Sequence, residues 1–429
     1  MTKQTITFLF LFLSFVAFGQ VDRQKLEEAL FNLPDVSFKH IPSQSDNEVT
    51  YELKVKQPLD HQDKSKGHFY QRVVFTHKGF DRPVIMETNG YDLYPYPSEL
   101  SYILGANYLN IEHRFFGNSI PDGKPWPYLT LEQVTADLHK INQLFKEIYQ
   151  GKWISTGVSK GGQTTLFYKY FYPEDVDVAI PYVAPFDYAK EDTRIYDFLD
   201  SVGTATCRNK IRTFQLHVLK NKKPILEKLK WYAQGKNLTF DYIGGLEKAF
   251  EYAVLEYDFS FWQSQISCDD IPSLQNLDAV VEHFNKVSDI SFLDDKTMKK
   301  FESHYYQAGT QMGYYGYNIE PFKKYVSFSS NPSAVHMPSS AKNEEFSDTL
   351  ILKVKNWLET DANNLLYIYG ETDTWSATRV TPSVNTNSQS FILPGKGHYE
   401  ARIKNMSSEM KKDFFNKLQS MSGVVPIKQ

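Results

Sequence analysis

One short segment restricts the fold of this 429-residue chain more than any other feature: the G-x-S-x-G pattern of residues 157–161. It ends an apolar stretch, residues 153–157, that predicts a buried strand, and it begins a segment, residues 161–172, that predicts a helix. A serine in a sharp turn from strand to helix needs small neighbours, because backbone segments approach closely there and side chains two residues away would clash. The pattern therefore predicts a nucleophile elbow with Ser159 at its tip.

Strands and helices alternate along most of the chain, with one long interruption. The predicted strands are residues 49–57, 71–76, 84–88, 106–112, 153–157, 176–183, 365–369 and 390–393. The predicted helices outside the interruption are residues 131–149, 161–172, 348–358 and 405–421. Residues 190–343 have a mainly helical pattern, and residues 22–46 look like a short polar leader. We therefore predict an α/β-hydrolase sheet with a large helical cap inserted between the half that holds the nucleophile and the half that holds the acid and the histidine.

The expected divisions are a signal peptide at residues 1–19, a sheet core at residues 20–189 and 344–429, and the cap at residues 190–343. In the first segment, Lys3 precedes the uncharged apolar run 6–18, and small residues Ala17 and Gly19 precede an expected cut before Gln20. This run is shorter than the roughly 20 residues that span a bilayer, and no cysteine follows it for a lipid anchor. We expect an exported protein, periplasmic or extracellular, without a stable membrane anchor.

Charge and cysteine content exclude several classes of function. A formal net charge of −4 gives no basic field that would attract nucleic acid. The chain has only two cysteines, Cys207 and Cys268, and no H-E-x-x-H or C-x-x-C spacing, so we expect neither a metal site nor a cofactor. In an exported protein these two cysteines form either one disulfide or two buried thiols, and the sequence leaves both open.

A serine hydroxyl is a useful nucleophile only when a base removes its proton and an acid orients that base. In an α/β-hydrolase the three residues follow the order Ser, acid, His, each after the end of a strand. Asp373 and His398 follow predicted strands in that order, the histidine after a Gly-rich turn. Glu371 is a rival acid that lies nearer its strand end, and His113 is a rival base that precedes the serine. The order and setting favour Ser159, Asp373 and His398.

The oxyanion of an acyl-transfer reaction needs backbone N–H donors beside the nucleophile. In this fold they come from the residue after the nucleophile, here Lys160, and from the loop after an earlier strand, here at Gly90 or Tyr91. The Lys160 side chain is either solvated or packed, and we expect its backbone to matter more.

Several segments outside the triad resemble a family of proline-specific serine peptidases. They are residues 57–61 (QPLDH), 69–72 (FYQR), 112–119 (EHRFFGNS), 182–185 (YVAP), 257–263 (YDFSFWQ), 306–314 (YQAGTQMGY) and 370–375 (GETDTW). Over residues 57–398 the chain is similar to the secreted bacterial prolyl tri/tetrapeptidyl aminopeptidases, which are related to the lysosomal prolyl carboxypeptidase and dipeptidyl peptidase group. Gln311 stands where the lysosomal relatives often have Glu, which favours the bacterial branch and leaves the peptide register open.

The resemblance implies that Ser159 is the nucleophile, Asp373 the acid and His398 the general base. It also implies cleavage after a proline near the N-terminus of short peptides, beneath a helical cap. The expected partners are therefore peptides with a free N-terminus.

An aminopeptidase must also recognise an α-ammonium group, which requires a carboxylate. Glu112 and Glu371 are the candidates, although Glu112 has an alternative structural role as a partner of Arg114 or another base. Trp375 either lines a proline pocket or simply packs. A carboxylester hydrolase on the same fold is the alternative function, and it would need no ammonium anchor.

Overall fold

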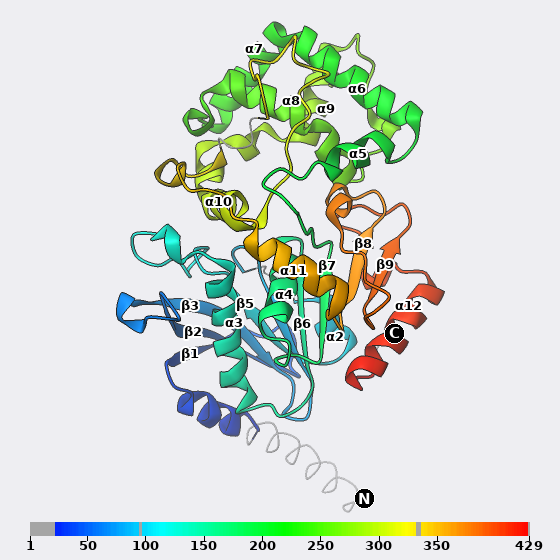
Figure 1. The fold of residues 1–429 in the computed structure, drawn as a ribbon. Helices are drawn as coiled ribbons and strands as arrows, with labels where there is room; N and C mark the ends of the chain where they lie inside the picture. The colour runs from blue at the N-terminus through cyan, green and yellow to red at the C-terminus, as the bar shows by residue number, and fades with distance from the viewer. Residues whose placement is uncertain (1–21, 94–96, 332–335, 428–429) are drawn as a thin grey trace, which may run out of the picture.

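The computed structural model describes residues 22–93, 97–331 and 336–427. A sheet of nine strands is formed by these residues, in the order β1-β2-β3-β5-β4-β6-β7-β8-β9 (Figure 1). The strands are β1 (Val36–Ile41), β2 (Val49–Pro58), β3 (His68–His77), β4 (Val84–Thr88), β5 (Asn107–Ile111), β6 (Trp153–Val158), β7 (Val178–Tyr182), β8 (Leu366–Gly370) and β9 (Gln389–Leu393). The pairs β1–β2, β2–β3 and β3–β5 are antiparallel and the others are parallel.

Helices cover both faces of this sheet. They are α2 (Glu99–Ile103), α3 (Leu131–Lys146), α4 (Lys160–Phe171), α11 (Thr349–Thr360) and α12 (Ser408–Ser422). On β4, Ile85 packs in a cluster with residues of α2 and α12, whereas its neighbours Val84 and Met86 pack with residues of α3. Successive side chains of β4 therefore pack on opposite faces of the sheet, as expected for a strand that is buried on both faces. The predicted α/β-hydrolase fold class is confirmed.

The amino-terminal segment differs from its prediction as a polar leader. Residues 22–32 form a helix, and β1 follows it at the edge of the sheet. Leu26 and Leu30 of this helix are fully buried against strands β2 and β3. Four-residue spacing places the two leucines on one helical face, so a short apolar stripe is enough to dock the segment. The predicted signal peptide, residues 1–19, lies outside the described residues.

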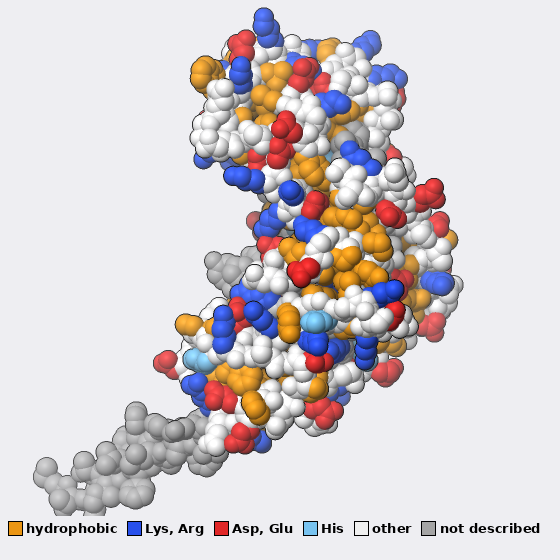
Figure 2. Space-filling model, turned by 90° about the vertical axis from the view of Figure 1, so that its left-hand side faces the viewer, with side chains coloured by type: hydrophobic (Ala, Val, Ile, Leu, Met, Phe, Trp, Pro, Cys, Tyr) orange, Lys and Arg blue, Asp and Glu red, His pale blue; other side chains and the backbone are white. Residues whose placement is uncertain are grey.

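Six α-helices with an apolar core of their own lie between β7 and α11 in the part of the chain that the structure describes (Figure 1). They are α5 (Arg194–Ser201), α6 (Ala205–Lys220), α7 (Lys222–Lys236), α8 (Leu246–Gln263), α9 (Leu277–Ser288) and α10 (Asp295–Gln307). We call this part the cap. The surface is hollowed between the cap and the sheet part in the side view of Figure 2. Each helix in the described residues is too short or too polar to cross a bilayer.

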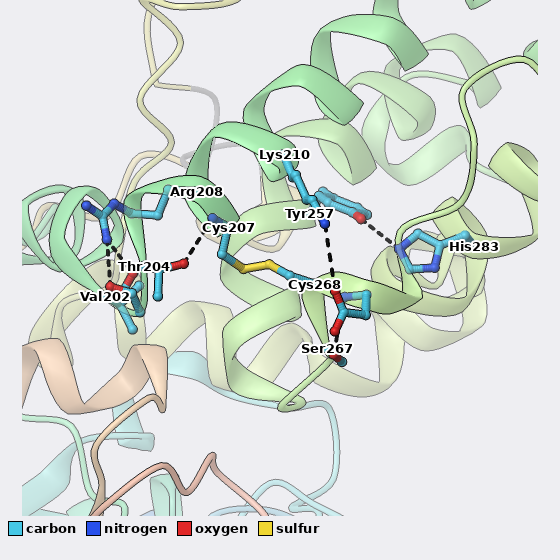
Figure 3. Close-up of a disulfide and its surroundings, with 11 residues drawn as sticks. Val202, Thr204, Cys207, Arg208, Lys210, Tyr257, Ser267, Cys268 and His283 are labelled. Atoms are coloured by element: carbon cyan, nitrogen blue, oxygen red, sulfur yellow. Dashed lines mark hydrogen bonds and ion pairs between the residues drawn. A yellow bond between two sulfur atoms is a disulfide. The ribbon is translucent and has the colours of Figure 1, made fainter.

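A disulfide links Cys207 to Cys268 within the cap (Figure 3). Cys207 lies in the first turn of α6, and Cys268 follows the carboxyl end of α8, so the bridge fastens these two helices together. Their Cα atoms are 5.6 Å apart, which is an ordinary separation for a disulfide. Of the two states that the sequence left open, the structure has the bridge.

Candidate active site

Ser159 lies in a strained turn between β6 and α4. It is the residue before the helix, with φ 58° and ψ −124°, a backbone conformation that residues with a side chain rarely adopt. A Cβ atom at Gly157 would lie 2.3 Å from the Gly161 carbonyl oxygen, and one at Gly161 would lie 2.6 Å from the Thr88 carbonyl oxygen. Both glycines are therefore required by close backbone approach. The turn leaves Ser159 partly exposed at the carboxyl end of β6.

Asp373 and His398 meet through a direct hydrogen bond. The Asp373 Oδ2 and His398 Nδ1 atoms are 2.8 Å apart, and both side chains are buried. Donation from Nδ1 to the carboxylate leaves Nε2 as the acceptor, which is the tautomer that a general base needs. The two residues follow β8 and β9, and the carboxyl ends of parallel strands β6, β7, β8 and β9 share one edge of the sheet. Ser159 follows β6 at that edge.

The rival acid and base have other partners. Glu371 is exposed, and its Oε2 atom accepts a hydrogen bond from the Gly395 N–H at 2.7 Å. His113 is buried, with Nδ1 2.7 Å from the Arg114 carbonyl oxygen and Nε2 3.2 Å from Lys160 Nζ. The His113 imidazole therefore faces a lysine, whereas the His398 imidazole faces a carboxylate.

The loop after β4 lies directly against the first turn of α4. A Cβ atom at Gly90 would lie 2.8 Å from the Gly161 nitrogen, so only glycine fits there. Lys160 Nζ donates a hydrogen bond of 2.8 Å to the Gly90 carbonyl oxygen. Because a trans peptide is planar, holding the Gly90 carbonyl on one side directs the Tyr91 N–H to the other. The Lys160 side chain thus orients one of the two N–H donors expected for an oxyanion.

The Lys160 ammonium group is buried without a carboxylate partner among the described residues. It lies 5.5 Å from the ring centroid of Tyr91 and 5.3 Å from that of Phe116, distances typical of cation–π contacts. His113 donates from Nδ1 to a carbonyl, so its Nε2 is free to accept from Lys160. Burial lowers the pKa of Lys160 well below its ordinary value. Of the two states left open for this side chain, the structure has the packed one.

We expect Lys160→Met to lower kcat by about 10²–10³-fold with little change in KM, the usual cost of one oxyanion donor. The reason is that the Gly90–Tyr91 peptide loses the hydrogen bond that fixes its direction. Lys169→Met is a matched control, because Lys169 is a buried lysine of the same helix whose Nζ binds the Val176 carbonyl, away from Ser159. A Lys160→Met protein with unchanged kcat would show that this side chain does not position the donor.

The segment from Glu112 to Ser119 is a compact structural unit. The Glu112 carboxylate accepts hydrogen bonds from the Asn118 N–H and the Ser119 hydroxyl, each at 2.8 Å, and from the Leu93 N–H at 3.3 Å. Burial nevertheless raises the pKa of Glu112. Of the structural alternative for Glu112, Arg114 or another base, the Arg114 pairing is not formed, because Arg114 pairs with Asp137; Arg72 is the base whose charge acts on Glu112.

Aromatic rings join the loops after β4 and β8 to the cap. We call this set the aromatic bridge, and it consists of Tyr91, Phe259, His304, Tyr314, Tyr315 and Trp375. Trp375 packs 5.1 Å from Phe259 and 5.3 Å from Tyr315, centroid to centroid. His304 lies 5.6 Å from Tyr91 and 5.5 Å from Tyr314, which completes the connection. Tyr91, Tyr314 and Trp375 remain partly exposed.

The carboxyl end of α8 is bonded to the loops of both the acid and the histidine. The Thr374 hydroxyl donates to the Phe259 carbonyl oxygen at 2.8 Å, and the His398 N–H donates to the Gln263 carbonyl oxygen at 3.0 Å. Gln265 continues this contact by donating to the Gly395 carbonyl oxygen at 2.9 Å. Sequence reasoning had not assigned a role to this end of α8, although it falls in one of the familial segments.

The described residues contain no group of three or more His, Cys, Asp or Glu side chains arranged to hold a metal ion. The strained Ser159 turn and the His398 imidazole that Asp373 orients are the groups at this edge of the sheet that suit nucleophilic catalysis.

A family model and one curated relative assign the chain to a single family. The family model described as PS-10 peptidase S37 matches residues 24–429. The prolyl tri/tetrapeptidyl aminopeptidase of Streptomyces mobaraensis is 30% identical over 384 residues, which cover 86% of this chain and 80% of that protein. Among solved structures, a proline iminopeptidase from Mycobacterium smegmatis has a TM-score of 0.39 at 14% identity, covering 90% of this chain and 99% of that one. A thermophilic esterase from Thermogutta terrifontis has a TM-score of 0.36 at 13% identity, covering 86% and 99%.

Proposed function

Because this chain belongs to the S37 family of serine peptidases, we propose that it releases short peptides from free N-termini by cleaving after proline. In this proposal Ser159, Asp373 and His398 form the catalytic triad. The observation that supports it most directly is the 2.8 Å hydrogen bond between Asp373 and His398 at the sheet edge where the strained Ser159 turn ends.

The proposed reaction starts from the hydrogen bond between His398 Nδ1 and Asp373, which leaves His398 Nε2 able to accept a proton. His398 Nε2 takes the proton of the Ser159 hydroxyl, whose oxygen attacks the carbonyl carbon of the prolyl residue. The resulting oxyanion accepts hydrogen bonds from the N–H groups of Lys160 and Tyr91. His398 then protonates the leaving amine, and water cleaves the acyl-enzyme with the same histidine as base.

Two further features favour a peptide ending in proline. The partly exposed rings of Tyr91, Tyr314 and Trp375 offer flat apolar surfaces, which suit a pyrrolidine ring better than a charged side chain. The export signal expected in residues 1–19 would place the enzyme in the periplasm or outside the cell, where short peptides are available.

A matched substrate panel tests the proposal. We expect the purified mature chain to hydrolyse Ala-Ala-Pro and Ala-Pro amides with a free N-terminus, and to cleave their N-acetylated forms and aryl esters of short acids poorly. Ser159→Ala protein, purified in parallel, reports any contaminating activity. Cleavage of esters without cleavage of prolyl peptides would contradict the proposal and support the carboxylester hydrolase alternative.

A further inference from the structure

Glu256, in the middle of α8, has a carboxylate held entirely by neutral hydroxyl groups. Its Oε2 atom accepts from the Tyr315 hydroxyl at 2.8 Å and the Tyr317 hydroxyl at 3.0 Å, and its Oε1 atom accepts from the Ser260 hydroxyl at 3.0 Å. A carboxylate has about four lone-pair sites, so three donors leave it one further bond to make. Glu256 also remains partly exposed.

Burial also raises the pKa of four other acidic groups, but Glu256 differs from them in having no cation nearby among the described residues. Each of those has an arginine nearby that favours its charged form: Glu87 has Arg402, Glu112 has Arg72, Asp187 has Arg194 and Asp258 has Arg212. Glu256 forms no ion pair with any described residue, and burial raises its pKa to about 7, with the neighbouring Asp258 adding to the effect. A desolvated carboxylate without a cation is costly unless a cation arrives with a ligand.

The position of Glu256 relative to the catalytic loops is fixed by α8 itself. The carbonyl of Phe259, three residues further along the helix, accepts from Thr374, which directly follows Asp373. Three residues of α-helix advance about 4.5 Å along the axis. Tyr315, which donates to Glu256, also packs 5.3 Å from Trp375. The carboxylate therefore lies about one helical turn from the acid loop, on the cap side of the aromatic bridge.

We propose that Glu256 binds the α-ammonium group of the peptide substrate and so determines how many residues precede the cleaved bond. This inference rests on the proposed function, and it assigns the ammonium to a residue that the sequence did not suggest. An extended tripeptide spans about 10 Å, which suits an anchor located beyond the aromatic bridge. An ammonium donates three hydrogen bonds, and the tyrosine rings around Glu256 add favourable contact with a cation.

Glu112 and Glu371 are less suited to this role. Glu112 accepts as many hydrogen bonds as Glu256, from two backbone N–H groups and one hydroxyl, but the charge of Arg72 already favours its ionised form. Glu371 is exposed, and an ion pair in water contributes little. The same substitution, Glu→Gln, at all three positions compares the candidates directly.

The decisive measurement is the ratio of kcat/KM for Ala-Ala-Pro amide with a free N-terminus to that for its N-acetylated form. We expect Glu256→Gln to lower this ratio by about tenfold to a hundredfold, the worth of a hydrogen bond to a charged group. The loss should fall on the free peptide alone, because the acetylated peptide has no ammonium to bind. Glu247→Gln is the matched control, since Glu247 is an exposed residue of the same helix paired with Lys222.

A ratio in Glu256→Gln equal to that of wild type would overturn the inference while leaving the proposed function intact. Failure of the proposed function looks different, because wild-type protein would then not cleave prolyl peptides at all. A fall in the ratio for Glu112→Gln or Glu371→Gln, with Glu256→Gln unchanged, would move the anchor to that residue.

The pH dependence of wild-type protein tests the inference without a variant. Groups facing Glu256 are Asp258 and Ser260 on its own helix, Tyr305 of α10, and Tyr314, Tyr315 and Tyr317 of the following loop. Below its pKa of about 7 Glu256 is neutral, so selectivity for the free peptide should rise as pH passes 7. It should fall again above about pH 8, where the peptide amine loses its proton. A ratio that is constant from about pH 6 to 9 would contradict the inference.

Discussion

Replacing Ser159 by alanine is expected to lower kcat for prolyl peptides by about a millionfold, as loss of the nucleophile does in serine peptidases. The strained turn, the two glycines and the adjacent N–H donors all present this one hydroxyl at the edge of the sheet. Alanine keeps the turn but removes the oxygen that would attack the substrate. Single-turnover and steady-state rates with a free Ala-Ala-Pro amide measure the loss, and an unchanged melting temperature shows that the fold persists.

The effect of a second substitution shows whether the triad acts as a unit. In Ser159→Ala protein, the further change His398→Ala should reduce kcat little, because the base has no hydroxyl left to deprotonate. Independent roles would instead make the two losses multiply. Near-normal hydrolysis by Ser159→Ala would contradict the triad altogether.

Replacing Arg114 by methionine is expected to reduce the free energy of unfolding by about 3–5 kcal/mol, the cost of breaking one side of a buried ion pair. Arg114 is completely buried and forms two hydrogen bonds to Asp137, at 2.6 and 2.8 Å, and others to backbone carbonyls of the surrounding loops. Without it, the Asp137 carboxylate would keep the His61 ring as its partner but lose its guanidinium, and the carbonyls would lose their donor.

Denaturant unfolding measures this loss as a shift in midpoint at constant slope. Arg72→Met is the matched control, because Arg72 of β3 pairs with Glu52 at a partly exposed site and should contribute less than about 1 kcal/mol. Equal shifts for the two variants would show that burial of Arg114 adds nothing. The contacts of Glu112, Arg114 and Ser119 give segment 112–119 a structural role, because these side chains hold the surrounding loops together.

Glycines and short apolar strands near the catalytic candidates were enough to predict them from the sequence. Ser159 and His398 each have glycines beside them, and the strands before Ser159, Asp373 and His398 are short apolar runs that pattern alone identifies. The antiparallel edge strand β1 was harder to predict from the sequence. In β1, Lys39 and His40 are adjacent and interrupt the alternation of polar and apolar residues, and the strand is partly exposed along its length, so it gives a weak signal. The preceding helix buries few leucines and resembles a polar leader.

The cap side of the site could not be predicted from the sequence for a different reason. Glu256 becomes notable only because Tyr315 and Tyr317, about sixty residues later, donate to it. Nothing in a helical pattern distinguishes a glutamate that faces two tyrosines from one that faces water. The same holds for Lys160, whose burial depends on Gly90 and His113 from two other loops.

The contact between α8 and the catalytic loops restricts how the two parts of the molecule can swing apart. Because His398 and Thr374 are bonded to backbone carbonyls at the end of α8, a separation there would displace the imidazole itself. The disulfide holds that end of the helix to α6. Helix α10 is fastened to the core as well, by the Lys300–Asp92 ion pair at 2.9 Å and by the Ser303 hydroxyl, which donates to the Phe115 carbonyl oxygen at 3.1 Å. A movement of the cap at α10 would break these side-chain contacts, whereas a movement at α8 would also shift the His398 imidazole.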